Sequence, residues 1–175
     1  MEDIAVKMEY GCVFCRTGKE YALAETLRDQ MEGLDAFVPA KIRACRHGGR
    51  VDEQKVTLFP GYVFFRAPED FPVAKMNVYN ETYFVLRSDE DQWQLRGADR
   101  ALVDQFYHNG GTVGFSKAWY EGDRIRIAEG FLKNHEGRIV KVNRRAQTAQ
   151  IRLDFVGRQT TIWLGFEVID PPEEN

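Results

Sequence analysis

The sequence predicts an α+β protein with an N-terminal α/β sandwich built on an antiparallel sheet and a small C-terminal β-barrel. Amphipathic helical stripes between short apolar strands predict the sandwich, and four closely spaced alternating strands predict the barrel. The 175 residues are 43% hydrophobic and 13% aromatic, which is enough to bury two small cores. We expect one domain at 1–115, a linker at 116–120 and a second domain at 121–175.

The first elements are a strand and a helix. The apolar run at 10–15 predicts a buried strand, and apolar residues at helical spacing predict a helix over 18–32 that ends at Gly33. The apolar stripe consists of Leu23, Ala24, Leu27 and Met31. Thr17 and Glu20 have the spacing of a capping box, in which each side chain satisfies a free N–H group at the start of the helix.

A β-hairpin comes next. Extended arms at 36–44 and 51–59 enclose Gly48-Gly49, a pair that favours a tight hairpin turn. After Pro60-Gly61 the chain enters its most strand-like stretch, at 62–65. We expect three further elements in this domain: a weak helix at 69–78, a strand at 83–86 and a helix at 98–108.

The character of the sequence changes after residue 121. Four short segments alternate Ile, Val or Leu with polar residues, which is the period of a half-buried strand. They lie at 124–127, 138–142, 149–153 and 161–164. Four such strands so close together predict a small antiparallel barrel.

Charge and hydropathy limit the possible classes of protein. With 24 basic and 27 acidic side chains the net charge is −3, so the chain is not one that coats nucleic acid, and any such contact needs a local basic patch. The sequence has no apolar run of about 18 residues and no features of a signal peptide. We therefore expect a cytoplasmic protein without membrane contact.

The cysteines and histidines do not predict catalysis. Cys12 and Cys15 have the spacing of a redox or zinc motif, but within one strand they point to opposite faces. A zinc site needs four ligands, and Cys45 and His47 would have to supply the other two from a hairpin. The three histidines fall in separate elements, so no nucleophile–base pair can be assembled. We expect reduced thiols, no metal, no cofactor and no enzyme activity.

Two sets of motifs resemble one family. The segment 122–127, followed by Gly137, resembles a KOW motif. Upstream, Arg-Thr-Gly-Lys-Glu at 16–20, Phe-Val-Pro at 37–39 and Leu-Phe-Pro-Gly-Tyr-Val-Phe at 58–64 resemble the NGN domain of NusG-type transcription elongation factors. Together the two halves cover nearly the whole chain in the order that the family has.

The resemblance implies a monomeric factor that binds the clamp helices of RNA polymerase and catalyses no reaction. The positions that match the apolar polymerase-binding pocket of the family are Tyr10, Phe14, Phe59 and Tyr62, and Phe71 occupies the place of the gate-loop contact. Aromatic anchors supply much of the energy of such interfaces. The alternative is that these rings pack in the core.

Several departures from the general NusG pattern resemble the specialised paralogues RfaH and LoaP, which implies processive antitermination on a few long operons. The barrel loop at 130–137 differs from the NusG loop that helps to bind Rho or a ribosomal protein, although Phe131, Leu132 and Val156 remain candidate contacts for such a partner. The alternatives are a general NusG-type factor and a ribosome- or mRNA-associated KOW protein. Because the alternating strands favour a barrel, we expect a permanent barrel instead of a helical autoinhibited form.

Nucleic-acid contacts are expected from local basic residues. The resemblance places Arg16 and Lys19 where paralogues contact the non-template DNA strand. The hairpin is the most basic window of its domain, with Asp52 and Glu53 as its only acids, and is a candidate to bind DNA or an RNA hairpin. Its candidate residues are Lys41, Arg43, Arg46, Arg50 and Lys55. A weaker candidate is the turn with Arg144 and Arg145, and the alternative for both segments is a solvated tip.

Overall fold

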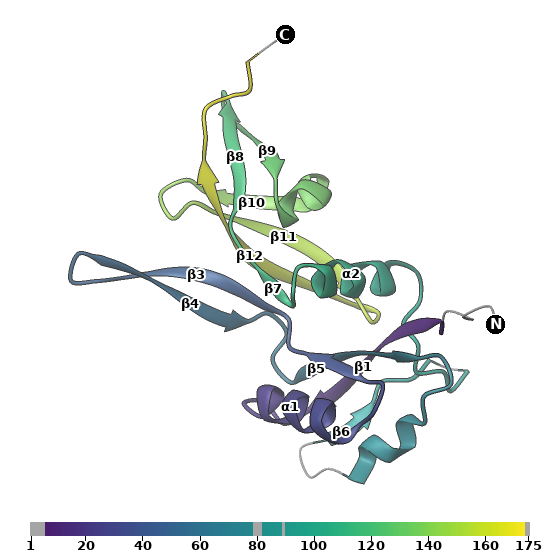
Figure 1. The fold of residues 1–175 in the computed structure, drawn as a ribbon. Coiled ribbons are helices and arrows are strands. Elements are labelled where there is room, and N and C mark those ends of the chain that lie inside the picture. Colours follow the sequence, from purple (N-terminus) through teal and green to yellow (C-terminus); the bar gives the residue numbers. More distant parts are fainter. Residues whose placement is uncertain (1–5, 79–81, 89, 174–175) are drawn as a thin grey trace, which may run out of the picture. The chain divides into compact units, whose positions relative to one another are not determined.

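The computed structural model describes residues 6–78, 82–88 and 90–173. Its described residues form two compact units, one from 1–39 and 59–111 and the other from 40–58 and 112–175 (Figure 1). The residues expected to form a linker, 116–120, lie in strand β8 (Ser116–Glu121). The domain boundaries drawn from the sequence stay a prediction. None of the described helices is long and apolar enough to cross a membrane.

The first unit is built on an antiparallel sheet in the order β2-β5-β1-β6. Its strands are β1 (Met8–Cys15), β2 (Asp35–Phe37), β5 (Tyr62–Pro68) and β6 (Thr82–Val85). Strand β1 lies in the centre and pairs with β5 on one side and β6 on the other. The strands predicted at 10–15, 62–65 and 83–86 are present, so the predicted antiparallel sheet is confirmed.

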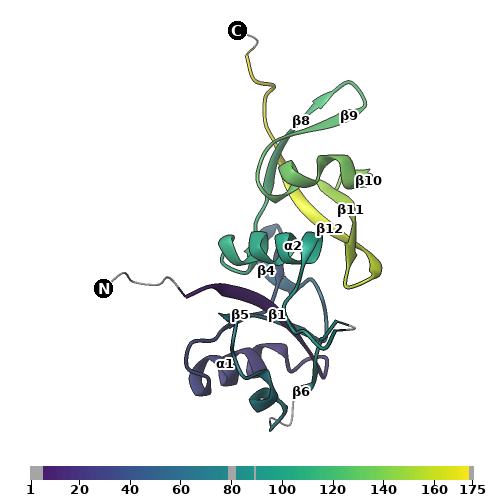
Figure 2. The ribbon, with the colours of Figure 1, turned by 90° about the vertical axis from the view of Figure 1, so that its right-hand side faces the viewer.

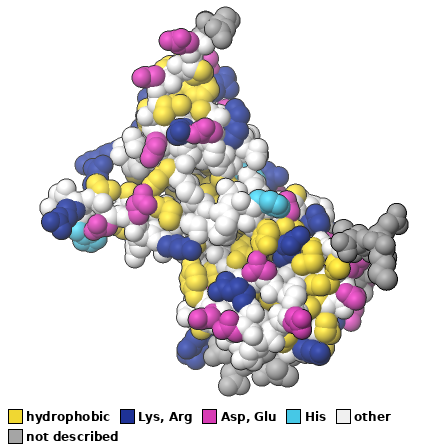
Figure 3. Space-filling view, viewed as in Figure 1, with side chains coloured by type: hydrophobic (Ala, Val, Ile, Leu, Met, Phe, Trp, Pro, Cys, Tyr) yellow, Lys and Arg dark blue, Asp and Glu magenta, His cyan; other side chains and the backbone are white. Residues whose placement is uncertain are grey.

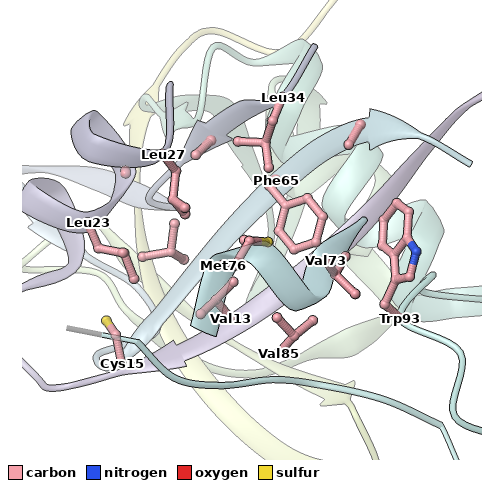
Figure 4. Packing of buried hydrophobic residues seen from close by; sticks show 14 of the residues in the cluster. Val13, Cys15, Leu23, Leu27, Leu34, Phe65, Val73, Met76, Val85 and Trp93 are labelled. Atoms are coloured by element: carbon pink, nitrogen blue, oxygen red, sulfur yellow. The ribbon is translucent and has the colours of Figure 1, made fainter. Parts of the chain in front are cut away.

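Helices cover both faces of this sheet (Figure 2). Helix α1 (Glu20–Gln30) packs on the face that carries Val13 and Phe65, together with the 3-10 segment η1 (Val73–Val78) (Figure 4). Helix α2 (Gly97–His108) packs on the other face, where Phe106 contacts the ring of Phe59. The result is the predicted α+β sandwich, and the predicted helices at 18–32 and 98–108 are present with slightly shorter or shifted bounds.

The second unit contains a five-stranded sheet in the order β10-β11-β12-β8-β9. Four of its strands match the predicted ones: β9 (Arg124–Glu129), β10 (Ile139–Asn143), β11 (Thr148–Phe155) and β12 (Arg158–Val168). The fifth strand, β8, was not expected because its partner is distant in sequence: it runs parallel to the end of β12, from Phe166 opposite Ser116. The 3-10 segment η2 (Phe131–Arg138) was also not expected.

The predicted hairpin is present and belongs to the second unit. Strands β3 (Ala40–His47) and β4 (Arg50–Thr57) pair along their whole length. Gly48 and Gly49 have φ values of +56° and +83°, as a two-residue type I′ turn requires. The short strand β7 (Thr112–Val113) pairs with β3 only at Ala40 and Lys41. Beyond Lys41 the hairpin is therefore a two-stranded ribbon.

Candidate protein-docking and nucleic-acid surfaces

Three aromatic side chains from neighbouring strands form an exposed cluster, the aromatic triad of Phe14, Tyr62 and Phe84. The strand register places Phe14 opposite both Tyr62 and Phe84. The Phe14 ring centroid lies 5.3 Å from that of Tyr62, edge-on, and 5.3 Å from that of Phe84, stacked. Phe84 is 49% exposed, and the other two rings are partly exposed. The triad is thus a pre-packed apolar surface that is open to a partner.

The same face of β1 is closed further along the strand. Because side chains alternate along a strand, Tyr10 and Cys12 lie on the face of Phe14, but both are buried. The Tyr10 hydroxyl donates a 2.7 Å hydrogen bond to the Asp104 carboxylate of helix α2, and burial together with this bond raises the pKa of Tyr10. Helix α2 therefore covers the Tyr10 end of the face and leaves the Phe14 end exposed.

Two of the five aromatic residues predicted to bind polymerase belong to the triad, and three are buried. Tyr10, Phe59 and Phe71 are only 2%, 7% and 9% exposed. The rings of Phe64 and Phe106 pack edge-on against Phe59, with centroids 6.0 and 5.9 Å away. The expectation that these three rings are exposed to a partner is corrected, because α2 and the η1 region cover them, and their part in polymerase binding stays a prediction. The three rings therefore pack in the core of the first unit.

Phe84 was not among the predicted site residues. The sequence contains a strand signal at 83–86, but a strand pattern does not say which strand becomes its neighbour. Only the observed pairing of β6 with β1 places Phe84 beside Phe14. Its 49% exposure, together with its stacking on the Phe14 ring, is what marks it as part of a surface.

A buried carboxylate holds the turn that presents Tyr62. Glu20 is 5% exposed, and its two oxygens accept hydrogen bonds from the N–H groups of Gly18 (2.8 Å) and Gly61 (2.7 Å). The predicted capping box is wrong, since Lys19 is the N-cap and no side chain bonds at the cap. The Glu20 carboxylate binds the N–H groups of the two glycines and is therefore not available for a capping box. Glu20 therefore ties the Pro60-Gly61 turn to the start of α1.

Gly61 itself allows a close approach in this turn. Its φ is +86°, and a Cβ atom there would lie 3.3 Å from the Cys15 carbonyl oxygen and 3.3 Å from the Phe14 ring. The Cys15 N–H donates a 2.7 Å hydrogen bond to the Gly61 carbonyl. A residue with a side chain at position 61 would strain the backbone and push against the triad.

The two basic residues predicted near the start of α1 are exposed. Arg16 and Lys19 are joined by a turn in which the Lys19 N–H donates to the Arg16 carbonyl at 3.0 Å. No salt bridge to either residue is found within the described part of the chain. Both cationic groups are available to a phosphate, and their contact with nucleic acid stays a prediction.

The five predicted basic residues of the hairpin do not form one patch. The register places Lys41, Arg43 and Arg50 on one face of the ribbon, and Arg46 and Lys55 on the other. Lys41 donates a 2.5 Å hydrogen bond to the carbonyl of Trp163 in β12, and burial lowers its pKa. Lys41 therefore anchors the base of the ribbon within its own unit.

The predicted partner contacts of the second unit differ in exposure. Phe131 and Leu132 are 4% and 0% exposed, so the expected exposed apolar knob is not present in this structure. The reason is that η2 turns both side chains inward, where Phe131 stacks on His135 at 4.7 Å. Val156 is 37% exposed in a turn and has a φ of +48°. The partner role of all three stays a prediction.

The basic turn of the second unit is partly engaged within the unit. Arg144 lies 4.3 Å above the Tyr120 ring and donates hydrogen bonds to the Gly122 carbonyl and the Asp123 carboxylate. Arg145 is exposed. Of the two predicted cations, Arg145 is the one that can reach a nucleic acid without breaking a contact.

Two of the three cysteines, Cys12 and Cys15, are buried thiols in different environments, and Cys45 is partly exposed. Cys12 is 0% and Cys15 is 1% exposed; Cys15 packs in the core under α1, while Cys12 lies on the opposite face of β1. Burial raises the pKa of Cys12, which favours the unreactive thiol. Among the described residues, no group of three or more His, Cys, Asp or Glu side chains is arranged to hold a metal ion.

Comparisons with known proteins agree with the observed fold. A family model described as "Transcription termination factor nusG" matches residues 8–96, which is half of the chain. The fold is similar to a solved structure of Thermotoga maritima NusG, titled for its domain interaction, with a TM-score of 0.58 and 18% identity over 91% of this chain and 94% of that one. No curated protein sequence matches the chain.

Proposed function

Since the chain belongs to the NusG family of transcription factors, we propose that it binds RNA polymerase through the aromatic triad and regulates elongation without catalysing a reaction. The clamp helices are the proposed docking site, as the family resemblance implies. The observation that supports this most is the exposed, mutually packed cluster of Phe14, Tyr62 and Phe84 on the first unit.

The physics of the triad suits a docking surface. Fully burying a large apolar side chain contributes roughly 1.5–3 kcal/mol relative to leaving it exposed, and the partly exposed triad rings would gain part of this on binding. Interface energy also concentrates in a few aromatic anchors. The rings are already ordered by their contacts with one another and by the Glu20 clamp, so little conformational entropy is lost on binding. Another aromatic residue outside the triad, Tyr21, is 48% exposed on helix α1, which packs on the opposite face of the sheet.

We further propose that the factor is a specialised one, similar to RfaH and LoaP, that acts on specific long operons through an RNA or DNA element. Exposed Arg16 and Lys19 support contact with the non-template strand. The burial of Phe131 and Leu132 argues against docking of Rho or a ribosomal protein on that loop. A general NusG-type factor is the second candidate, and exposed Val156 is the feature that favours it.

Binding to a purified clamp-helix fragment of RNA polymerase tests the docking proposal. The variants are Tyr62→Ala and Phe84→Ala, and the matched control is Tyr21→Ala, which removes an equally exposed ring from α1. We expect each triad variant to weaken binding by about 10-fold or more, as loss of an interface anchor does, and the control to bind as the parent does. Equal affinities for all four folded proteins would reject the proposal.

A further inference from the structure

The β3–β4 ribbon is open on every side beyond Lys41. Within the described part of the chain no third strand pairs with residues 42–47 or 50–55, and most of these side chains are exposed. Figure 3 shows cationic side chains and a histidine together at the end of this hairpin. At a rise of about 3.4 Å per residue, the free ribbon is roughly 20 Å long. It is long enough to enter a groove of a nucleic acid.

The two faces of the ribbon differ in chemistry. One, here called the Arg43 face, carries only groups that form hydrogen bonds or ionise: Arg43, Cys45, His47, Arg50, Asp52 and Gln54. The opposite Arg46 face mixes Arg46, Lys55 and Glu53 with the apolar side chains of Ile42, Ala44 and Val51. The Arg43 face is therefore the one suited to phosphates and base edges.

Side chains on the Arg43 face are ordered by local contacts. Arg43 donates a 2.7 Å hydrogen bond to the amide oxygen of Gln54 on the opposite strand, which leaves the rest of its guanidinium free to bind. At the tip, Arg50 lies opposite His47. Asp52 is the single acid on this face. A cationic surface with one acid attracts a polyanion.

The residue composition of the ribbon indicates which class of nucleic acid it suits. Residues 40–57 contain no Phe, Tyr or Trp, whereas proteins that bind single strands depend on aromatic rings for base stacking. The major groove of an RNA duplex is too narrow for side chains to read. The major groove of B-form DNA is about 12 Å wide and admits a two-stranded ribbon.

The spacing of the two arginines fits the same groove. Arg50 is paired with His47, four residues along the ribbon from Arg43, so the two backbones are about 14 Å apart. This separation is close to the width of the groove, so a ribbon that lies across the groove brings the two guanidinium groups near phosphates on its two sides.

We propose that the Arg43 face of the β3–β4 ribbon binds the backbone of duplex DNA, with Arg43 and Arg50 as the phosphate contacts. The proposal rests on the proposed function, because a factor that binds a transcribing polymerase works next to duplex DNA. It is tested on free DNA without polymerase, whereas the docking proposal is tested on polymerase without DNA, so that failure of one is distinguishable from failure of the other.

The experiment measures fluorescence anisotropy of a labelled 30-bp duplex with the intact protein at several salt concentrations. The test variant is Arg43→Ala/Arg50→Ala. The matched control is Arg46→Ala/Lys55→Ala, which removes the same charge from the opposite face. We expect the test variant to lose about 10-fold or more in affinity at about 50 mM salt and the log–log salt slope to fall by about 1.8, or 0.9 per phosphate contact. We expect the control to stay within about threefold.

A third variant, Arg43→Lys/Arg50→Lys, keeps the charges and should keep the salt slope, since a phosphate contact requires charge more than shape. Circular dichroism verifies that each variant is folded. Equal losses in the test and control variants would overturn the proposal, as would a lost slope in the lysine variant. Tighter binding to single-stranded DNA or to an RNA duplex of equal length, or no binding of the parent at about 100 µM, would overturn it too.

Discussion

At the scale of single residues, Glu20 is the group on which the proposed docking surface depends most. It is a buried carboxylate whose two oxygens satisfy two backbone donors from separate turns. Sequence reasoning gave it the role of a helix cap, since Thr17 and Glu20 have the required spacing. The pattern of a capping box cannot reveal that a distant glycine, Gly61, will offer a competing N–H group.

We expect Glu20→Ala to lower the free energy of unfolding by about 1–3 kcal/mol, because the buried Gly61 N–H group loses its acceptor and the part-buried Gly18 N–H group loses its own. Chemical denaturation followed by circular dichroism measures this. Glu25→Ala, an exposed site on the same helix, serves as the control and should change stability by less than about 0.5 kcal/mol. Equal effects of the two substitutions would contradict the clamp role of Glu20.

The aromatic residues show how far sequence reasoning reaches at this scale. It selected Phe14 and Tyr62, which lie in the triad, together with Tyr10 and Phe59, which are buried. Residue type and motif position cannot separate these outcomes, because exposure depends on where α2 ends above the sheet. Phe84 was missed for the related reason that its neighbour is set by strand pairing.

At the scale of elements, local signals predicted local structure well. Gly48-Gly49 predicted the hairpin, and alternation predicted strands β9 to β12. Strand β8 was taken for a linker because its stabilising partner is the far end of β12, a contact that no local pattern encodes. The segment η2 was missed because its buried face forms only against the rest of its unit.

A substitution at Gly130, at the start of η2, tests how this element packs. Its φ is +96°, and a Cβ atom would lie 2.7 Å from the Cα and Oγ atoms of Ser116. We expect Gly130→Ala to destabilise the protein by about 2 kcal/mol or more through backbone strain and the clash. Gly137→Ala, where nothing lies within 4 Å of the added atom, should be nearly neutral. Thermal unfolding of both variants decides, and equal melting temperatures would contradict the packing of η2 on β8.

His135 within η2 makes stability depend on pH. Burial, with a smaller effect from Arg138, lowers its pKa to about 4, below the usual value of about 6.5. The unfolded chain therefore binds a proton at a higher pH than the folded chain does. Above pH ~6.5, His135 is neutral in both states and does not reduce the free energy of unfolding. As the pH falls toward ~4, protonation of His135 in the unfolded chain lowers the free energy of unfolding by up to about 3 kcal/mol.

Denaturation between pH 7 and 4 measures this effect when the parent is compared with His135→Gln. We expect the variant to lose less stability than the parent does over this range. The control is His47→Gln, because His47 is exposed and has no salt bridge among the described residues, and this variant should lose stability over the range as the parent does. If His135→Gln also matched the parent, the buried neutral state of His135 would be contradicted.

At the scale of the whole molecule, composition and patterning predicted the α+β class, and the resemblance of the motifs implied a NusG-type fold. Both are confirmed by the two units and by the family match. Sequence reasoning did not predict that the hairpin groups with the C-terminal strands. That grouping arises from the pairing of β3 with β7 and from the Lys41–Trp163 hydrogen bond.

The central claim is that the aromatic triad is the surface that meets RNA polymerase, and photo-crosslinking tests it most directly. A benzoyl-phenylalanine placed at position 84 should crosslink to the clamp helices of the polymerase, as mass spectrometry of the crosslinked peptides would show. The same probe at position 21, on α1, should not. Crosslinks to the clamp helices from position 21 and none from position 84 would contradict the account.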